Sequence, residues 1–257
     1  MKRSFPLRGS AVAFAFACAL PFLVWNVRGA LIAAESFDYK TPTIRGCNGG
    51  EGWAGAWTGD NFVTPGSLEF AGYSTKGNRL TTLGDSMGTS DTVKCSSRTL
   101  ATTGRDDLLV DGRFGRPDTT IWFSFLANMP EGANAKTGMF AGISLLDDRQ
   151  ERMFFGRSSK RNAWAFERSG QMQWFSTNRA DLNVVFLVYK MTFRTTDAQV
   201  EMWVNPRPGV NDLSAVPAAA ADVVREFRFN RVRICSAPGT FSVDELRFGT
   251  TYADVAR

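Results

Sequence analysis

Apolar and polar residues alternate over short stretches along most of this chain, a pattern that predicts β-strands. The clearest run covers residues 198–205. One side of this strand carries Val200, Met202 and Val204, and the other carries Gln199, Glu201, Trp203 and Asn205. Pro206 ends the run, and residues 206–224 are expected to form a long loop with room for one helical turn.

A second run, at residues 119–126, is apolar on both faces. Ile121, Phe123 and Phe125 share one face, and Trp122, Ser124 and Leu126 share the other. We therefore expect a central strand that is covered on both sides. Further strands are expected at residues 139–146, 152–155, 162–166, 171–175, 184–194 and 226–234, and the charged segment 147–151 is typical of a hairpin turn.

The two ends of the sequence also have the pattern of strands. Residues 30–39 predict a first strand that contains Glu35. Residues 241–248 alternate in type before Gly249 stops the run, so Asp244 and Glu245 are expected on opposite faces of the last strand.

No segment beyond the N-terminal region keeps a 3.6-residue apolar period over the length of a helix. The chain has 257 residues, of which 44% are hydrophobic and 21% charged, and this suits one globular unit with a substantial core. The predicted fold class is therefore all-β, a sandwich of antiparallel sheets.

The N-terminal region is typical of a secretory signal. Lys2, Arg3 and Arg8 precede an apolar run at residues 11–24, and this run is shorter than the roughly 20 residues that cross a bilayer. We expect a signal peptide at residues 1–29, a domain at residues 30–257, and a secreted protein without a stable membrane span. Cleavage sites near Ala19, Ala30 and Ala34 stay open, although a cut at Ala34 would remove part of the first strand.

The formal charge of +5 and the isoelectric point near 9.2 do not point to nucleic acid, because the basic residues are scattered among acids. Removing the leader leaves Cys47, Cys95 and Cys235. In an exported chain a pair of these is expected to form a disulfide, and we favour Cys47 with Cys95; three reduced thiols are the alternative.

Three motifs carry a resemblance to a known family. They are Glu-x-Phe-Asp-Tyr after the first strand, Gly-Gly-x-Gly-Trp-x-Gly-x-Trp at residues 49–57, and Asp-Glu-Leu-Arg-Phe-Gly followed by Thr-Thr-Tyr-Ala-Asp-Val near the end. The chain resembles the concanavalin A-like (laminin G-like) jelly-roll proteins that planctomycetes and related bacteria secrete. The resemblance implies a jelly-roll sandwich, in which Trp53 and Trp57 are expected to seal one end rather than bind a sugar.

The same resemblance implies a structural Ca²⁺ site, because jelly rolls of this kind often hold Ca²⁺ through carboxylates of the first and last strands. Glu35 and Asp244 are the expected ligands, with backbone carbonyls completing the oxygen set. The alternative is that Asp244 caps a turn and that Glu35 is simply exposed.

The sequence excludes several classes of enzyme. It contains no His, so catalysis by a Ser-His or Cys-His pair is excluded. The Glu-x-Asp-x-x-Glu run of glucanases that share the implied fold is missing. The nearest acids, Asp147 and Glu151, are expected to be the solvated residues of a hairpin turn.

The strand at residues 198–205 supplies the candidate binding site. A Trp among hydrogen-bonding side chains is what a carbohydrate-binding face uses, so Trp203 is expected to stack on a sugar while Gln199, Glu201 and Asn205 bind its hydroxyls and Trp164 lines the groove. The alternative is that Trp203 packs beneath a loop.

The predicted function is therefore a secreted, non-enzymatic module that binds polysaccharide or adheres to it. A structural envelope or matrix protein without a small ligand is one alternative. The other is an unrecognised glycoside hydrolase or lyase, which would need two acids that converge in one cleft.

Overall fold

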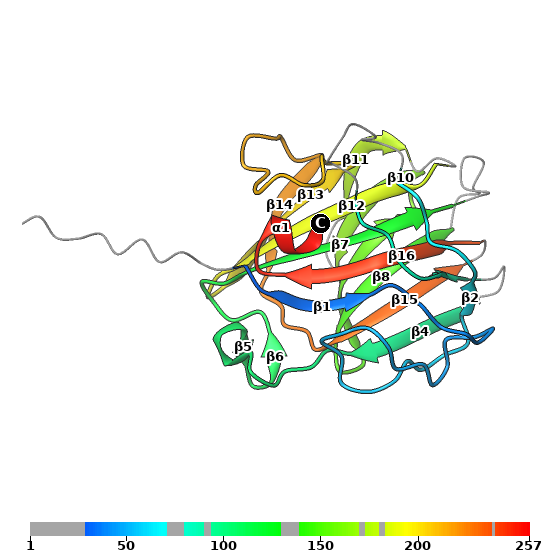
Figure 1. Cartoon of the computed structure of the whole chain (residues 1–257). Helices are drawn as coiled ribbons and strands as arrows, with labels where there is room; N and C mark the ends of the chain where they lie inside the picture. Colours follow the sequence, from blue (N-terminus) through cyan, green and yellow to red (C-terminus); the bar gives the residue numbers. More distant parts are fainter. Residues whose placement is uncertain are drawn as a thin grey trace, which may run out of the picture.

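The computed structural model describes residues 29–70, 80–89, 94–129, 139–169, 173–179, 183–237 and 240–257. The expected signal peptide, apart from Gly29, lies outside the described residues. Within the described ranges the chain is an all-β sandwich of two antiparallel sheets (Figure 1), as the sequence predicts.

The described strands of the first sheet number eight, and we call it the eight-stranded sheet. Its order is β14 (Ala220–Arg225), β13 (Asp197–Val204), β12 (Val185–Phe193), β7 (Thr120–Asn128), β16 (Ser242–Gly249), β3 (Ser86–Gly88) and β2 (Phe62–Thr64). Strand β1 (Leu31–Glu35) also pairs with β16, next to the position of β3. The last strand is thus a central one.

The second sheet has six described strands, and we call it the six-stranded sheet. Its order is β11 (Gln173–Arg179), β10 (Ala163–Arg168), β9 (Gln150–Arg157), β8 (Phe140–Asp147), β15 (Arg231–Ala237) and β4 (Lys94–Thr99). A small ribbon of β5 (Leu109–Val110) and β6 (Arg113–Phe114) follows a 3₁₀ turn at Asp106–Leu108, and the helix α1 covers Tyr252–Val255. Chain neighbours thus pair in hairpins while β15 and β16 return between earlier strands, which is the jelly-roll arrangement.

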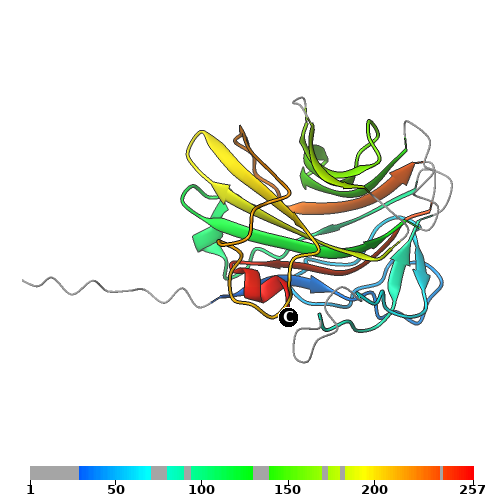
Figure 2. The same cartoon turned by 90° about the horizontal axis from the view of Figure 1, so that it is seen from above.

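The two sheets form stacked layers with the main core between them, and α1 lies on the outer side of the eight-stranded sheet (Figure 2). Strand β7 confirms the expected two-sided burial. Phe123 and Phe125 point into the main core, whereas Trp122 and Leu126 belong to a second hydrophobic cluster on the other face. Trp57 is 1% exposed and belongs to the main core, and Trp53 is partly buried against that core, so both rings are packed against the sandwich.

The segment after β13 differs from the expected long loop. Residues 220–225 form the edge strand β14 instead of a loop, because their backbone pairs with β13 from Met202 to Asp197. The remaining part of the loop covers the second hydrophobic cluster, to which it contributes Leu213. The run of alanines gave no alternation from which this edge strand could be predicted.

Strand β16 contains a bulge that the sequence pattern does not reveal. Its pairing with β7 shifts between Asp244 and Arg247, and Glu245 has a positive φ of 50°. Val243 and Leu246, three residues apart, therefore both reach the main core. Asp244 accepts a hydrogen bond from the backbone N–H of Leu68, and Glu245 accepts one from the backbone N–H of Leu83. Both partners belong to segments that precede β4. The prediction that Asp244 and Glu245 alternate strictly between the two faces of the strand is therefore wrong.

The disulfide joins Cys95 to Cys235, and the favoured pairing of Cys47 with Cys95 is wrong. Cys95 on β4 and Cys235 on β15 lie directly opposite each other in the sheet, with Cα atoms 4.4 Å apart, which is within the span that a disulfide bridges. Cys47 keeps a free thiol in the loop after β1.

Candidate functional site

The expected aromatic platform on β13 is covered. Trp203 is 5% exposed and stacks on Trp122 with ring centroids 5.6 Å apart. Its indole N–H donates to the carbonyl oxygen of Val216 in the covering loop at 2.9 Å. Trp164, the other expected groove residue, is fully buried in the main core. Neither ring is available to a sugar, which agrees with the alternative that Trp203 packs beneath a loop.

The polar partners expected beside Trp203 bond to their neighbours. Glu201 lies 3.4 Å from the Lys190 ammonium, and Gln199 accepts a hydrogen bond of 2.9 Å from Arg194. Asn205 accepts one of 2.8 Å from the backbone N–H of Phe186. The structure therefore keeps these side chains on or next to β13 but does not bring them to an exposed ring. Sugar binding here stays a prediction that the geometry does not favour.

The expected calcium ligands are also engaged with protein groups. Glu35 is 2% exposed and forms an ion pair with Arg98 at 2.6 Å. Asp244 is fully buried and accepts hydrogen bonds from the Ser67 hydroxyl and the Leu68 backbone N–H, and burial, chiefly, raises its pKa to about 8. Within the described ranges no group of three or more acidic or cysteine side chains is placed to hold a metal ion. The two residues therefore fit Ca²⁺ poorly, and calcium binding stays a prediction.

A groove lies on the outer face of the six-stranded sheet. In Figure 2 this sheet curls away from the eight-stranded sheet, so its outer face is the hollow one. The groove has a volume of about 370 Å³, within the usual range of binding sites for small molecules. It is lined by Cys95, Phe140, Glu151, Phe154, Ser159, Glu167, Gln173, Arg233 and Cys235.

Strand alternation places these side chains on one face. Ile143, Phe155 and Ile234 point into the main core, so their neighbours along β8, β9 and β15 point outward. The alternation along β9 is interrupted where its pairing with β8 shifts, between Leu145 and Leu146. Because of this shift Glu151 shares the outer face with Phe154, three residues further on.

One wall of the groove is an ion pair. The Glu151 carboxylate accepts hydrogen bonds from Arg233 at 2.5 Å and from the hydroxyl of Ser144 at 2.6 Å. About a third of the side chains of Glu151 and Arg233 is exposed, 35% and 33% respectively. This wall therefore offers both a hydrogen-bond acceptor and a donor to a molecule in the groove.

The opposite wall is a second polar pair. Gln173 on β11 donates to the Glu167 carboxylate on β10, and the Gln173 amide oxygen accepts from the hydroxyl of Ser158 at 2.6 Å. Phe154 lies between the two walls, since it pairs with Glu167 across β9 and β10. Phe140 meets the Phe154 ring edge-on, with centroids 6.1 Å apart. The groove thus has an aromatic floor between two polar walls, in which Phe140 is partly exposed and Phe154 is 8% exposed.

The absence of a side chain at Gly142 leaves room for this floor. Gly142 on β8 lies opposite Gly156 on β9. A Cβ atom on Gly142 would come within 2.8 Å of Cζ of Phe154 and 2.2 Å of the carbonyl oxygen of Phe155. Only glycine therefore lets the Phe154 ring lie across this part of the sheet.

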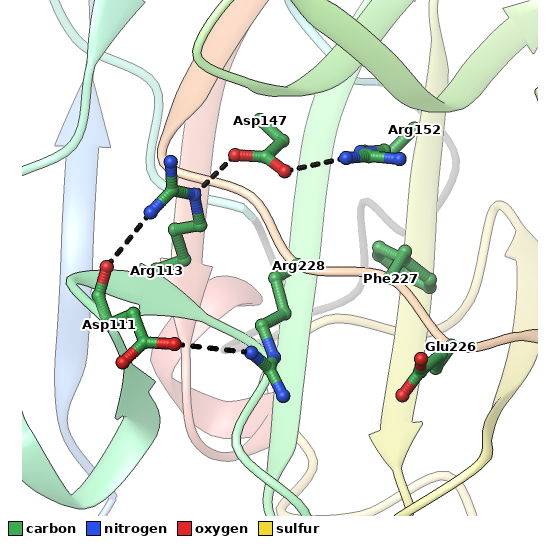
Figure 3. A pocket seen from close by; sticks show the side chains of 7 residues that line it. All are labelled: Asp111, Arg113, Asp147, Arg152, Glu226, Phe227 and Arg228. Atoms are coloured by element: carbon green, nitrogen blue, oxygen red, sulfur yellow. Dashed lines mark hydrogen bonds and ion pairs between the residues drawn. The ribbon is translucent and has the colours of Figure 1, made fainter.

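A second, charged hollow lies beyond the 147–152 hairpin (Figure 3). Asp147 accepts hydrogen bonds from Arg113 and Arg152, and Arg228 lies 3.7 Å from Asp111. Partial burial opposes ionisation, but the two guanidinium groups hold the pKa of Asp147 below its usual value. Asp147 is thus an ion-pair partner, and it lines a different hollow from Glu151.

Together the fold and the groove define the class of the protein, a jelly-roll β-sandwich with a polar and aromatic groove on the six-stranded sheet. No family model matches the chain, and no curated protein matches it by sequence. Within the described residues no helix is long and apolar enough to cross a membrane.

Similar solved structures include the binding domain of botulinum neurotoxin serotype D, at 8% identity and a TM-score of 0.39 over 86% of this chain and 47% of that one. The chain thus spans about half the length of that domain. The CBM2 module of the evolved Dit protein of Lactobacillus casei BL23 phage J-1 is similar at 9% identity and a TM-score of 0.42, over 87% and 96% of the two chains. An alginate lyase from Corynebacterium sp. is similar at 12% identity and a TM-score of 0.42, over 75% and 92%.

Proposed function

We propose that this protein is a secreted module that binds a polysaccharide in the groove of the six-stranded sheet, without cleaving it. The observation that carries the proposal is the groove floor between two hydrogen-bonding walls, where Phe140 is partly exposed and Phe154 is 8% exposed. A sugar ring has an apolar face and a rim of hydroxyls, so it suits an aromatic surface flanked by polar groups. The disulfide is consistent with a location outside the cytoplasm.

The walls supply both kinds of partner that hydroxyl groups need. Glu151 and Glu167 accept hydrogen bonds, while Arg233 and Gln173 donate them. The charges of Glu151 and Arg233 neutralise each other in their ion pair, so the ligand does not need a charge. We therefore infer a ligand rich in hydroxyl groups, such as a cell-surface or matrix polysaccharide.

A glycan array with the protein from residue 30 onward tests this proposal. The Gln173→Ala and Arg233→Met variants are expected to bind about five- to thirtyfold more weakly, because one to two hydrogen bonds of about 1 kcal/mol each are removed. Gln199→Ala on the opposite sheet is the matched control and is expected to bind as wild type. Equal binding by the wild type and all three variants would show that the glycan binds elsewhere. No binding to any glycan by folded wild-type protein would favour a structural matrix role.

Glycoside hydrolysis is a second candidate, because Glu151 and Glu167 line the same groove. Hydrolases of this kind use two carboxylates on either side of the scissile bond. Release of reducing ends from a bound polysaccharide, lost in both Glu151→Gln and Glu167→Gln, would establish that activity. Binding without release of reducing ends is the result that we expect.

A further inference from the structure

The side chain of Arg98 on β4 is enclosed by groups that favour a positive charge. Its exposed fraction is 1%, as is that of the Glu35 side chain with which it pairs at 2.6 Å. Its guanidinium also donates to the Tyr39 hydroxyl at 3.4 Å and to groups of the glycine-rich loop at residues 46–57, which lies over β1 and β4.

Four oxygen atoms accept hydrogen bonds from this guanidinium at short distance. They are the carboxylate of Glu35 at 2.6 Å, the amide oxygen of Asn48 at 2.7 Å, and the carbonyl oxygens of Gly49 and Gly55 at 2.8 Å each. A carboxylate, a side-chain amide and backbone carbonyls are the oxygen types that hold Ca²⁺ in proteins.

Two indole rings complete the enclosure. The Arg98 guanidinium carbon lies 5.2 Å from the ring centroid of Trp53 and 5.8 Å from that of Trp57, both within the range of a cation–π contact. The indole N–H groups are turned to other partners, the carbonyl oxygen of Ala34 and the carboxylate of Glu35. The rings therefore present their electron-rich faces to the cation.

We propose that the Arg98 guanidinium takes the place of a structural cation, so that the fold does not depend on Ca²⁺ at Glu35. It follows that truncation of Arg98 would leave a latent cation site, with one carboxylate, three neutral oxygens and two aromatic faces. That site would take a small guanidinium compound or a hard divalent cation. The poor fit of Glu35 to a bound metal has the same cause, since its charge is already neutralised from within the chain.

The test compares melting temperatures of wild type, Arg98→Ala and the control Arg45→Ala. Arg45 immediately precedes the loop at residues 46–57 and also pairs with a carboxylate, that of Asp60 at 2.6 Å, but its side chain is 64% exposed. Each protein is melted with chelator, with millimolar CaCl₂, with millimolar N-ethylguanidinium chloride, and with NaCl at matched ionic strength.

We expect wild type and Arg45→Ala to melt alike under all four conditions. Loss of one partner of a buried ion pair is expected to lower the midpoint of Arg98→Ala by roughly 10 °C. N-ethylguanidinium or Ca²⁺ is expected to restore at least about half of that loss, and NaCl is not. Equal restoration by NaCl, or none by either probe, would overturn the proposal.

Two further measurements keep the proposal testable if Arg98→Ala does not fold. Arg98→Lys keeps a cation among the same oxygens and is expected to fold, with a midpoint that chelator leaves unchanged. If Arg98→Lys did not fold, a cation at this position would not be sufficient for folding, which would contradict the proposal. A rise in the wild-type midpoint with CaCl₂ that Glu35→Gln abolishes would also overturn the proposal, because it would show that Glu35 binds metal despite Arg98.

Discussion

Asp244 is a fully buried carboxyl group on the last strand. It accepts hydrogen bonds from the Ser67 hydroxyl at 2.5 Å and from the backbone N–H groups of Leu68 and Glu245 at 2.9 and 2.7 Å. Burial is the largest influence and, with the neighbouring Glu245 charge, raises the pKa of Asp244 to about 8 although the donors oppose it. Folding therefore favours the protonated form of this group, whose pKa in the unfolded chain is about 3.9.

The sign of the resulting pH dependence follows from linkage. Stability from Asp244 is fully present below about pH 4 and is lost as pH rises towards and through 8. We expect the free energy of unfolding to fall between pH 5 and pH 8, with a slope of at most about 1.4 kcal/mol per pH unit from this group. Urea unfolding at a series of pH values measures it. Asp244→Asn cannot ionise and should give a flatter profile, so parallel profiles would refute the assignment.

Removal of the Trp203 ring distinguishes a structural role of this residue from a role in sugar binding. Because it packs against Trp122 beneath the 206–219 segment, Trp203→Ala is expected to destabilise the protein by about 3–5 kcal/mol. Glycan binding by the protein that remains folded is expected to be unchanged. Urea denaturation and the glycan array measure the two quantities separately. A loss of binding without a loss of stability would restore Trp203 as a sugar platform.

The disulfide acts at the scale of one element, the edge strand β4. Strand β4 pairs with β15 alone among the named strands of its sheet, and Cys95 ties it to Cys235 near the Lys94 end of that pairing. The two residues are 140 positions apart in sequence. The bond therefore closes a long loop and restricts the unfolded chain considerably.

Removal of this bond is expected to lower the free energy of unfolding by about 2–5 kcal/mol. The double variant Cys95→Ala/Cys235→Ala should show the loss in urea denaturation without reductant. Cys47→Ala is the control and should unfold like wild type, because its thiol is free. If Cys47→Ala were the less stable protein, the pairing in the structure would be contradicted.

Individual strands were easier to predict from the sequence than the pairing of those strands in the sheets. The alternation at Val200, Met202 and Val204 and the two apolar faces around Phe123 follow from side-chain chemistry that is local in sequence, and both predictions are confirmed. The disulfide partner of Cys95 could not be predicted, since it depends on which strands are adjacent.

The groove was missed for the same reason. Glu151, Glu167 and Arg233 belong to three strands, and the sequence shows only that each side chain is polar and near apolar neighbours. Alternation could have placed Glu167 and Arg233 on outer faces. It would have placed Glu151 on the wrong face, because the pairing shift at Leu145 cannot be seen in the sequence.

At the scale of the whole molecule the two sheets share one core. Phe123 on β7 contacts Phe155 of the other sheet with centroids 5.4 Å apart, and Phe155 contacts Tyr189 on β12 at 4.6 Å. Neither sheet can separate from the other without exposing these rings. The domain from residue 30 onward is therefore expected to unfold as one cooperative unit.

Coincident urea transitions in tryptophan fluorescence and far-ultraviolet circular dichroism would demonstrate this cooperativity. Six tryptophans lie in the domain from residue 30 onward, between Trp53 and Trp203, and they belong to both sheets and to the loop after β1. Two resolved transitions would show instead that the sheets, or the second hydrophobic cluster, unfold independently.

The pairing of β1 with β16 determines when the protein can fold. A chain is synthesised from its N-terminus, so β1 emerges from the ribosome early and its partner β16 emerges last. Because β16 also pairs with β7, the central part of the eight-stranded sheet cannot form until β16 has been synthesised. We therefore expect the growing chain to lack its complete eight-stranded sheet until β16 has been synthesised.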